Sequence, residues 1–282
     1  MSSKTTHAPR PHHHHARHGG KLRRFLQKPK GILIVLLAGL TAVAAMTAGP
    51  ALVAPGLLAA VATAFLLDGV LLRWKTGKWT FPDGAILTAL IVAMILSPHE
   101  SWWIAAATTA FGVVSKYLLR TRTANVLNPA AAALLVNYFV FHSGQSWWGA
   151  LSESELPLVG LLLAIGIYIA DRVTRLTAAV AFLGGYYVLF TLAAFLGDPA
   201  HVAGIFRPPD LQAALFFALV MVTDPPTSPP RPRDQILFGL AVALIAFGIH
   251  HFAQGIYYLL VALLIANVGE AWRRSHARRA HG

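Results

Sequence analysis

The sequence predicts an all-α polytopic membrane protein, with ten transmembrane helices arranged as two inverted repeats of five. Composition is the first reason: 56% of the 282 residues are hydrophobic and only 12% are charged, about half the usual share of charge. Long apolar runs also follow one another along the chain, which is typical of repeated membrane crossings. The chain has no cysteine, so disulfides, thiolate catalysis and cysteine-ligated iron–sulfur clusters are excluded within it.

The second reason is a stretch that occurs twice, 127 positions apart. Residues 82–98 read PDGAILTALIVAMILSP and residues 209–225 read PDLQAALFFALVMVTDP, with Pro-Asp, Met and a final Pro at matching places. The helices predicted at 84–97 and 211–223 are short, because their apolar parts extend about 17–18 Å against about 30 Å of hydrocarbon. Two such segments at corresponding places in two halves indicate a binding site near the bilayer midplane. The alternative is chance similarity, because biased composition produces weak repeats easily.

Loop charge is the third reason. We predict spans at approximately residues 31–48, 51–72, 84–97, 102–119, 129–141, 156–170, 176–196, 211–223, 235–249 and 255–269. With the N-terminus inside, every Lys and Arg except Arg207 falls on the cytoplasmic side, as the positive-inside rule requires. Without the two short spans, basic residues at 116–122 and 172–175 would face outward. The seven Trp, at 74, 79, 102, 103, 147, 148 and 272, fall near predicted interfaces, as in an aromatic belt.

The predicted organisation follows from these spans. Residues 1–30 are polar, basic and rich in His, so we expect a disordered tail and interpret its His run as inert rather than as a metal site. Because each half has an odd number of spans, the second half is inverted relative to the first. Ten spans in all place both termini in the cytoplasm. We expect the protein in the inner (plasma) membrane. The predicted units are the cytoplasmic tail 1–30, a first five-helix repeat 31–141, an outer loop 142–155, a second five-helix repeat 156–269 and a basic cytoplasmic tail 270–282.

Acidic and His residues in the apolar regions are few. Asp83 and Asp210 open the two short segments, where we expect them to cap helix N-termini; ion binding is the alternative. Asp68, near the end of the second span, is expected to pair with Lys116, and an ion path is its alternative role. The internal His residues, at 99, 142, 201, 250 and 251, all fall at the predicted outer face, and we interpret them as ordinary interfacial residues rather than as haem or metal ligands.

Two polar stretches suggest a site. Asn125-Val-Leu-Asn128-Pro129 opens the fifth span, where Asn128 is expected to cap the helix and the following alanines allow a helix or a flat ligand to approach. Two amides three residues apart would also suit the uracil-like edge of an isoalloxazine ring, which needs donors and acceptors. Capping explains Asn128 but not Asn125. The turn at 223–228, TDPPTS, either positions the end of the second short helix against a ligand or reflects turn chemistry alone.

These pieces resemble one family, RnfD/NqrB: the RnfD proteins of the Rnf ferredoxin:NAD oxidoreductase and the NqrB proteins of the sodium-pumping NADH:quinone oxidoreductase. The matching pieces lie at 82–98, 116–133, with its NVLNPA, and 216–239, FFALVMVTDPPTSPPRPRDQILFG. The resemblance implies ten helices in two repeats, electron transfer across the membrane between flavins, and a riboflavin pocket to which the Asn-x-x-Asn-Pro region contributes. Carried over by position, the resemblance nominates Asn125 and Asn128. With Pro129, Asp83, Thr223 and Asp224 from the stretches described above, these are the candidates for cofactor binding.

One departure from the family bears on the cofactor. In the family, a Ser-Gly-Ala-Thr-type sequence in the outer loop after the fifth span carries FMN on its Thr, whereas residues 142–155, HSGQSWWGALSESE, contain no Thr. We therefore expect a noncovalent flavin, riboflavin or FMN, or a partner protein that supplies the missing carrier, and no covalent FMN.

Two functional hypotheses follow. The first is an electron-transfer subunit, itself without catalytic residues, that works with flavin or iron–sulfur partner subunits, with or without coupling to ion transport. The second is a channel or transporter for ions or small solutes, because inverted repeats with two short central helices are typical of transporters. No motif for hydrolysis, phosphoryl transfer or nucleic-acid binding occurs.

The topology can be tested with accessibility labels. We expect residues 74–80, 121–124 and 229–233 to be labelled from the inside, and residues 143–153 and 199–207 from the outside, because this arrangement keeps basic loops in the cytoplasm. If 121–124 were labelled from the outside, two spans and the inverted repeat would be lost.

Overall fold

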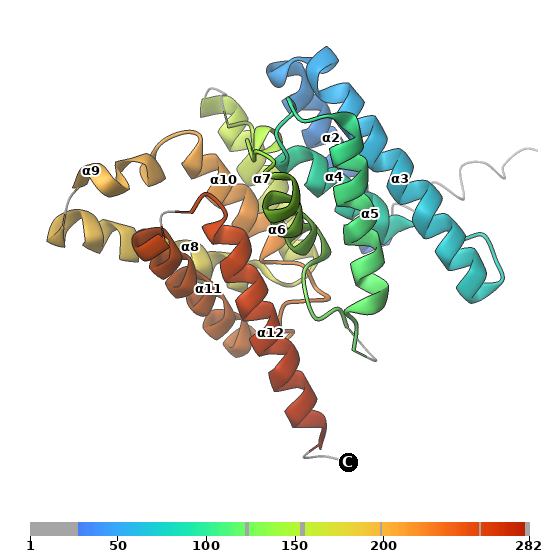
Figure 1. The fold of residues 1–282 in the computed structure, drawn as a ribbon. Helices are drawn as coiled ribbons and strands as arrows, with labels where there is room; N and C mark the ends of the chain where they lie inside the picture. Colours follow the sequence, from blue (N-terminus) through green and yellow to red (C-terminus); the bar gives the residue numbers. More distant parts are fainter. Residues whose placement is uncertain (1–27, 122–123, 153–155, 198, 254, 280–282) are drawn as a thin grey trace, which may run out of the picture.

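A computed structural model describes residues 28–121, 124–152, 156–197, 199–253 and 255–279 of the chain. The predicted tail at 1–30 lies outside the described residues except for its last three positions, as do residues 280–282 of the predicted C-terminal tail. Within the described ranges the protein is helical, and its β-pairing is limited to two isolated bridges. Figure 1 shows α2, α3 and α5 on one side of the molecule and α8, α9 and α11 on the other. Between them, α6 of the first half packs against α12, and α7 of the second half packs against α2.

Each of the ten predicted spans coincides with a helix. The helices of the first half are α2 (Pro29–Ala48), α3 (Pro50–Thr76), α4 (Asp83–Ile95), α5 (Trp102–Leu118) and α6 (Pro129–Phe141). Those of the second half are α7 (Leu156–Arg172), α8 (Leu176–Leu196), α10 (Asp210–Phe216), α11 (Pro232–Ala253) and α12 (Tyr258–Arg279), and α10 continues as a π-helix, η3 (Phe217–Met221). Short elements α9 (Pro199–Val202), η1 (Trp148–Ala150) and η2 (Ala203–Phe206) lie in the connections.

Helix lengths agree with the predicted pattern in part, since the predicted span at Pro129–Phe141 is also a short apolar helix. Among the described helices, α2, α3, α8 and α11 are long and apolar enough to cross a membrane. The two repeated segments form short apolar helices, Asp83–Ile95 and Asp210–Met221, as predicted. The first of these is enclosed: α4 packs against α2, α3, α5 and α6, and nine of its residues are buried.

The starts of the short helices differ from the prediction. Asp83 and Asp210 lie in the first turns, whereas Pro82 and Pro209 occupy the N-cap positions without a side-chain capping bond. Asp83 instead lies 3.3 Å from the ammonium group of Lys30. A carboxylate in the first turn still interacts favourably with the helix dipole, so the electrostatic part of the expectation holds without the hydrogen bond.

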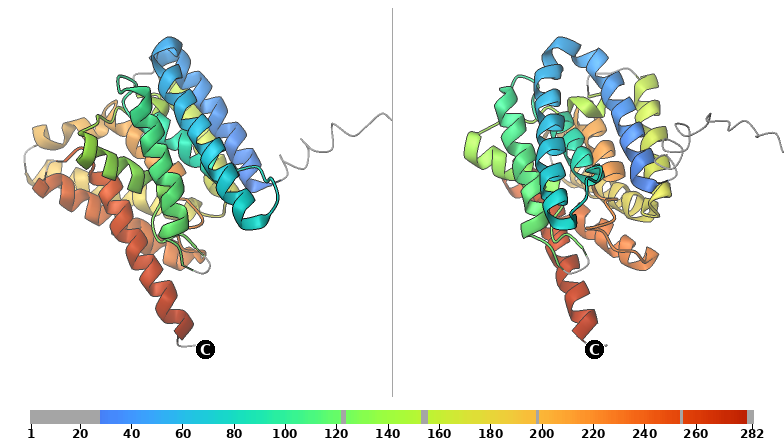
Figure 2. Two further views of the ribbon diagram at one scale, coloured as in Figure 1. Left: turned by 45° about the vertical axis from the view of Figure 1, so that its right-hand side comes forward. Right: turned by 90° about the vertical axis from the view of Figure 1, so that its right-hand side faces the viewer.

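The predicted basic C-terminal tail is helical in its described part. Residues 270–279 continue α12, and Figures 1 and 2 show this end of the helix projecting from the body of the chain. Glu270 explains the extension, because it pairs with Arg273 and Arg274 at helical spacings of three and four residues.

The described part of the predicted outer loop, residues 142–152, packs against the helices. The backbone N–H groups of Ser146 and Trp147 donate to the carbonyl of Ile95, and the Trp148 indole donates to the carbonyl of Ala93. The segment 143–151 therefore folds back onto the C-terminal end of α4. Trp147 and Trp148 are only 8% and 5% exposed, so their predicted place in an aromatic belt is wrong: the segment that carries them packs against both α4 and α10.

Close packing of this segment depends on Gly149. A Cβ atom there would overlap Cβ of Met94 on α4, so the approach of the loop to α4 requires a glycine.

Gly149→Ala should therefore lower stability by roughly 1–3 kcal/mol or more, the usual cost of overpacking a core. Thermal unfolding of the purified protein in mild detergent would measure the loss. Gly160→Ala on α7 is the matched control, because nothing lies within 4 Å of the position of its Cβ. Equal unfolding temperatures for the two variants would contradict the described packing.

Candidate functional site

The predicted Asn125–Pro129 stretch forms a cap and a turn. Asn128 caps α6, as expected: its Oδ1 accepts a hydrogen bond from the backbone N–H of Ala131 at 3.1 Å, and Pro129 stands in the first turn. Asn125 is half-buried, and its backbone pairs with that of Arg120 in an isolated bridge. The bond from the N–H of Val126 to the carbonyl of Leu119, 2.9 Å long, holds the same turn. Capping thus explains why Asn stands at position 128. Asn125 lies in the turn that precedes the helix.

The alanines that follow Pro129 serve helix packing. A Cβ at Gly112 on α5 would lie 3.2 Å from the carbonyl oxygen of Pro129 and 3.3 Å from Cβ of Ala133. The sequence allowed either a helix or a flat ligand against this face of α6, and the structure places the helix α5 there. A flat ligand at Asn128 must therefore lie on another side.

The 223–228 turn is closed by its own hydroxyl groups. The Thr223 hydroxyl donates to the carbonyl of Leu219 at 2.7 Å, which finishes the preceding helix. The hydroxyl of Thr227 donates to the carboxylate of Asp224 at 2.9 Å, and that of Ser228 donates to the carbonyl of Asp224 at 2.8 Å. These are the local bonds by which Asp, Ser and Thr stabilise turns.

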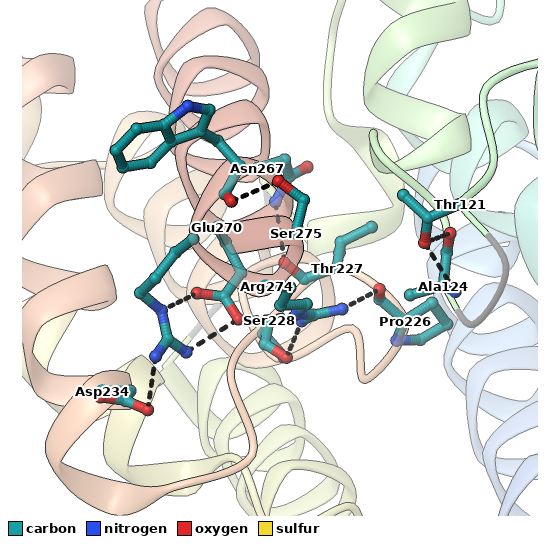
Figure 3. Close-up of polar contacts among 12 residues, drawn as sticks. Thr121, Ala124, Pro226, Thr227, Ser228, Asp234, Asn267, Glu270, Arg274 and Ser275 are labelled. Atoms are coloured by element: carbon teal, nitrogen blue, oxygen red, sulfur yellow. Dashed lines mark hydrogen bonds and ion pairs between the residues drawn. The ribbon is translucent and has the colours of Figure 1, made fainter. Parts of the chain in front are cut away.

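One residue that sequence reasoning missed, Asn267 on α12, joins the two stretches. Its Oδ1 accepts the backbone N–H of Asn128 at 2.9 Å, and its Nδ2 donates to the carbonyl of Thr227 at 3.4 Å. The side chain is buried, with 1% exposed, and Figure 3 shows it reaching the turn. A signal was present, because an Asn within an apolar span is expensive and needs partners.

Charged groups on the next turn of α12 hold the other side of the 223–228 turn. Arg274 donates to the carbonyls of Pro226 and Ser228, at 3.0 and 2.6 Å (Figure 3). Glu270, which is buried, accepts hydrogen bonds from Arg273 and Arg274. Two guanidinium groups compensate the cost of burying this carboxylate. Removing either arginine would leave the negative charge of Glu270 buried with less compensation, which destabilises the fold.

Arg175 approaches the same turn from the start of α8. Its Nε donates to the hydroxyl of Ser228 at 3.2 Å. Burial, and then the positive charge of Arg274, lower the pKa of this guanidinium, yet an arginine keeps its proton at physiological pH. The turn is therefore held from two helices by positive groups.

A second group of charges lies at the start of α4. Asp83 pairs with Lys30, and the ammonium groups of Lys30 and Lys116 both lie within 4 Å of the position that a Cβ at Gly84 would take. Lys116 is 3.7 Å from Asp68, as the sequence predicted, and the Tyr117 hydroxyl donates to the same carboxylate at 2.7 Å.

The carboxyl group of Asp224 interacts electrostatically with cationic side chains of both charged regions. Burial raises the pKa of its carboxyl group to about 6, and the Thr227 hydrogen bond and the charges of Lys30, Lys116 and Arg175 oppose that rise. The five candidates Asn125, Asn128, Pro129, Thr223 and Asp224 thus belong to two segments that Asn267 connects. The sixth candidate, Asp83, lies at the start of α4, where it pairs with Lys30.

Comparison with known proteins gives the family. The sequence model of the NQR2, RnfD, RnfE family matches residues 9–156, more than half of the chain. The chain belongs to this family. The match includes α2–α6, with the first short helix and the Asn125–Pro129 stretch.

Individual family members show the same relation at modest identity. The D subunit of the ion-translocating oxidoreductase complex of Shewanella amazonensis is 23% identical, over 74% of this chain and 80% of its own length. The protein of the same name from Tolumonas auensis is 24% identical, over 74% and 81%. The B subunit of the Na⁺-translocating NADH-quinone reductase of Chlamydia caviae is 34% identical over a shorter region, 29% of this chain and 18% of its own length.

Asp224 makes stability depend on pH in a direction that can be tested. Its folded-state pKa, about 6, lies above the ordinary value of 3.8, so the folded protein binds this proton more tightly and loses stability as pH rises between these values. At pH 7.5, Asp224→Asn should be more stable than wild type by about 2–3 kcal/mol, since one pKa unit corresponds to about 1.4 kcal/mol.

The advantage of Asp224→Asn should disappear below about pH 4, where the folded and the unfolded wild type both hold the proton. Thermal unfolding of the two proteins across this pH range measures the effect, with the exposed Asp171→Asn as control. An advantage that is the same at low pH and at pH 7.5 would contradict the described burial of the charge.

Proposed function

We propose that this chain is an integral, multi-pass membrane subunit of an ion-translocating oxidoreductase complex and that it passes electrons through a bound flavin. Family membership and the names of its relatives support the first part. The meeting of the two predicted polar segments at Asn267 carries the second. Partner subunits, flavin or iron–sulfur proteins, supply electrons to this chain and accept them from it, so the chain itself needs no catalytic residue.

The proposed arrangement in the membrane follows the sequence. Ten helices cross the inner (plasma) membrane, both termini lie in the cytoplasm, and the repeats 31–141 and 156–269 run in opposite directions. The coincidence of all ten predicted spans with helices supports it, as does the asymmetry of Lys and Arg. In this arrangement Asn125, Asn128 and the 223–228 turn lie at the cytoplasmic side of the bilayer.

The proposed flavin site lies between the 125–129 segment and the 223–228 turn. The chemistry fits: the carboxamide of Asn125 offers a donor and an acceptor, and Asn128, whose Oδ1 is used in the cap, offers its amide nitrogen. The carboxylate of Asp224 adds an acceptor, while Thr223 and Pro129 shape the ends of η3 and α6 that border the site. Asp83 contributes indirectly, because it pairs with Lys30, and the positive charge of Lys30 favours the ionised carboxylate of Asp224. A bound flavin supplies the redox chemistry that a chain without cysteine lacks.

We propose that this flavin is riboflavin or FMN and that it is held noncovalently. The segment 142–155 contains no Thr to carry a phosphodiester, and its described part is occupied in packing against α4. Flavin should therefore leave the protein on denaturation, and no fluorescent band should remain at the size of this chain on a denaturing gel.

Asn125→Leu tests the site. The protein purified in mild detergent should be yellow or take up riboflavin, and Asn125→Leu should weaken binding roughly ten- to hundredfold. The loss of a net hydrogen bond, about 0.5–1.5 kcal/mol, and the unpaired ring edge, about 1–3 kcal/mol, give this range. Quenching of riboflavin fluorescence on titration measures the dissociation constant.

Asn125 is a better probe than Asn128, whose replacement also removes a helix cap worth about 1 kcal/mol. Asn137→Leu, a buried Asn at the opposite end of α6, serves as control and should bind riboflavin as wild type does. A colourless wild-type protein that takes up no riboflavin would exclude the electron-transfer proposal and favour a channel or transporter.

A further inference from the structure

We propose that Asn267 is the positioning residue of the flavin site, because its side chain sets the distance between the cap of α6 and the 223–228 turn. The inference rests on the proposed function, but it concerns a residue that neither motif contains. Asn267 belongs to α12, more than a hundred positions from Asn128 in sequence, and its amide bonds one segment through each of its two polar atoms.

The bond to Asn128 controls where the cap stands. Asn128 is only 3% exposed, so its backbone N–H cannot rely on water and needs an acceptor within the protein. Oδ1 of Asn267 is that acceptor, at 2.9 Å. Because Oδ1 of Asn128 is held by the N–H of Ala131 at the same time, both the backbone and the side chain of Asn128 are held, and the direction of its amide nitrogen is set.

The bond to Thr227 positions the part of the site that contains Asp224. Nδ2 of Asn267 donates to the carbonyl of Thr227, whose hydroxyl in turn donates to the carboxylate of Asp224. A single chain of hydrogen bonds therefore runs from the N-cap of α6 through Asn267 to Asp224. These hydrogen bonds set the distance between Asn128 and Asp224, and a ligand that contacts both residues must match that distance. Errors of a fraction of an ångström weaken such contacts.

The neighbouring bonds of α12 separate positioning from folding. Arg274 holds the carbonyls of Pro226 and Ser228 independently of Asn267, and Glu270 anchors Arg274 in turn. Without the amide of Asn267, the turn thus stays attached to α12 while its register against Asn128 is released. The expected effect is on ligand affinity and on the environment of the ligand more than on the fold.

The test uses riboflavin as the probe and the full chain in detergent. Asn267→Leu, which has nearly the same shape and no polar atoms, should raise the riboflavin dissociation constant at least tenfold. It should also shift the absorption maximum and the midpoint potential of the flavin that is bound at saturation. Asn267→Asp keeps the acceptor for the N–H of Asn128 but loses the donor to the carbonyl of Thr227, so it should also weaken binding if both bonds set the spacing.

Asn137→Leu provides the matched control. Asn137 is as buried as Asn267, at 2% exposed, and its Nδ2 donates to the hydroxyl of Ser143 at the far end of α6. This variant also removes a hydrogen-bonded buried amide, and it should leave the affinity, spectrum and potential unchanged.

The failures of the two proposals are distinguishable. If wild type binds riboflavin and Asn267→Leu binds it with the same affinity and spectrum, the positioning role is wrong and the proposed function stands. If Asn137→Leu weakens binding as much as Asn267→Leu does, the effect is general destabilisation, and the positioning role is again wrong. A wild-type protein that binds no riboflavin would overturn the proposed function and this inference with it.

Discussion

The rest of the structure depends on one constraint: α4 and the α10–η3 helix are too short to cross a bilayer, so polar backbone groups at their ends must find partners inside the protein. In apolar surroundings each unpaired backbone group costs several kcal/mol. At the end of α4 the partners are N–H groups of the 143–151 segment and the indole of Trp148. At the end of η3 they include the hydroxyl of Thr223. Each short helix therefore requires a polar segment folded against its end.

The candidate site is a consequence of the same requirement at the next level. The 223–228 turn satisfies part of its own backbone through Asp224, Thr227 and Ser228, and its remaining carbonyls take donors from α12. Asn267 and Arg274 supply these donors. Because Asn267 also accepts from Asn128, satisfying the second short helix fixes the start of α6 in the first half. The polar groups at this place are held by several bonds each, which is the preorganisation that ligand and cofactor sites need.

Electrostatics distinguishes the two sides of this site. Cationic side chains surround the 223–228 turn and the start of α4. Four carboxylates, those of Asp68, Asp83, Asp234 and Glu270, form ion pairs with lysines or arginines. The carboxylate of Asp224 accepts instead from a neutral group, the hydroxyl of Thr227, and its pKa is raised.

Much of this protein could be predicted from the sequence because the signals are local. Hydropathy and loop charge predicted ten spans that all proved helical, and apolar length alone predicted the short helices α4 and α10. The Asn128 cap with Pro129 and the Asp68–Lys116 pair were also correct. A cap depends on the residues next to it. The Asp68–Lys116 pair joins two helices, but it could be predicted because a carboxylate in an apolar span needs a cation at the same membrane depth.

The remaining features were decided by tertiary structure, because they depend on which segments meet. Trp147 and Trp148 look like interfacial residues until the loop folds back and Gly149 lets it reach Met94. The alanines of α6 accept α5 rather than a ligand, because Gly112 stands opposite. Asn267 carries no motif, and its role exists only because α12 passes between two segments about a hundred residues apart in sequence. Hydropathy records that a side chain is buried; only the fold determines what it is buried against.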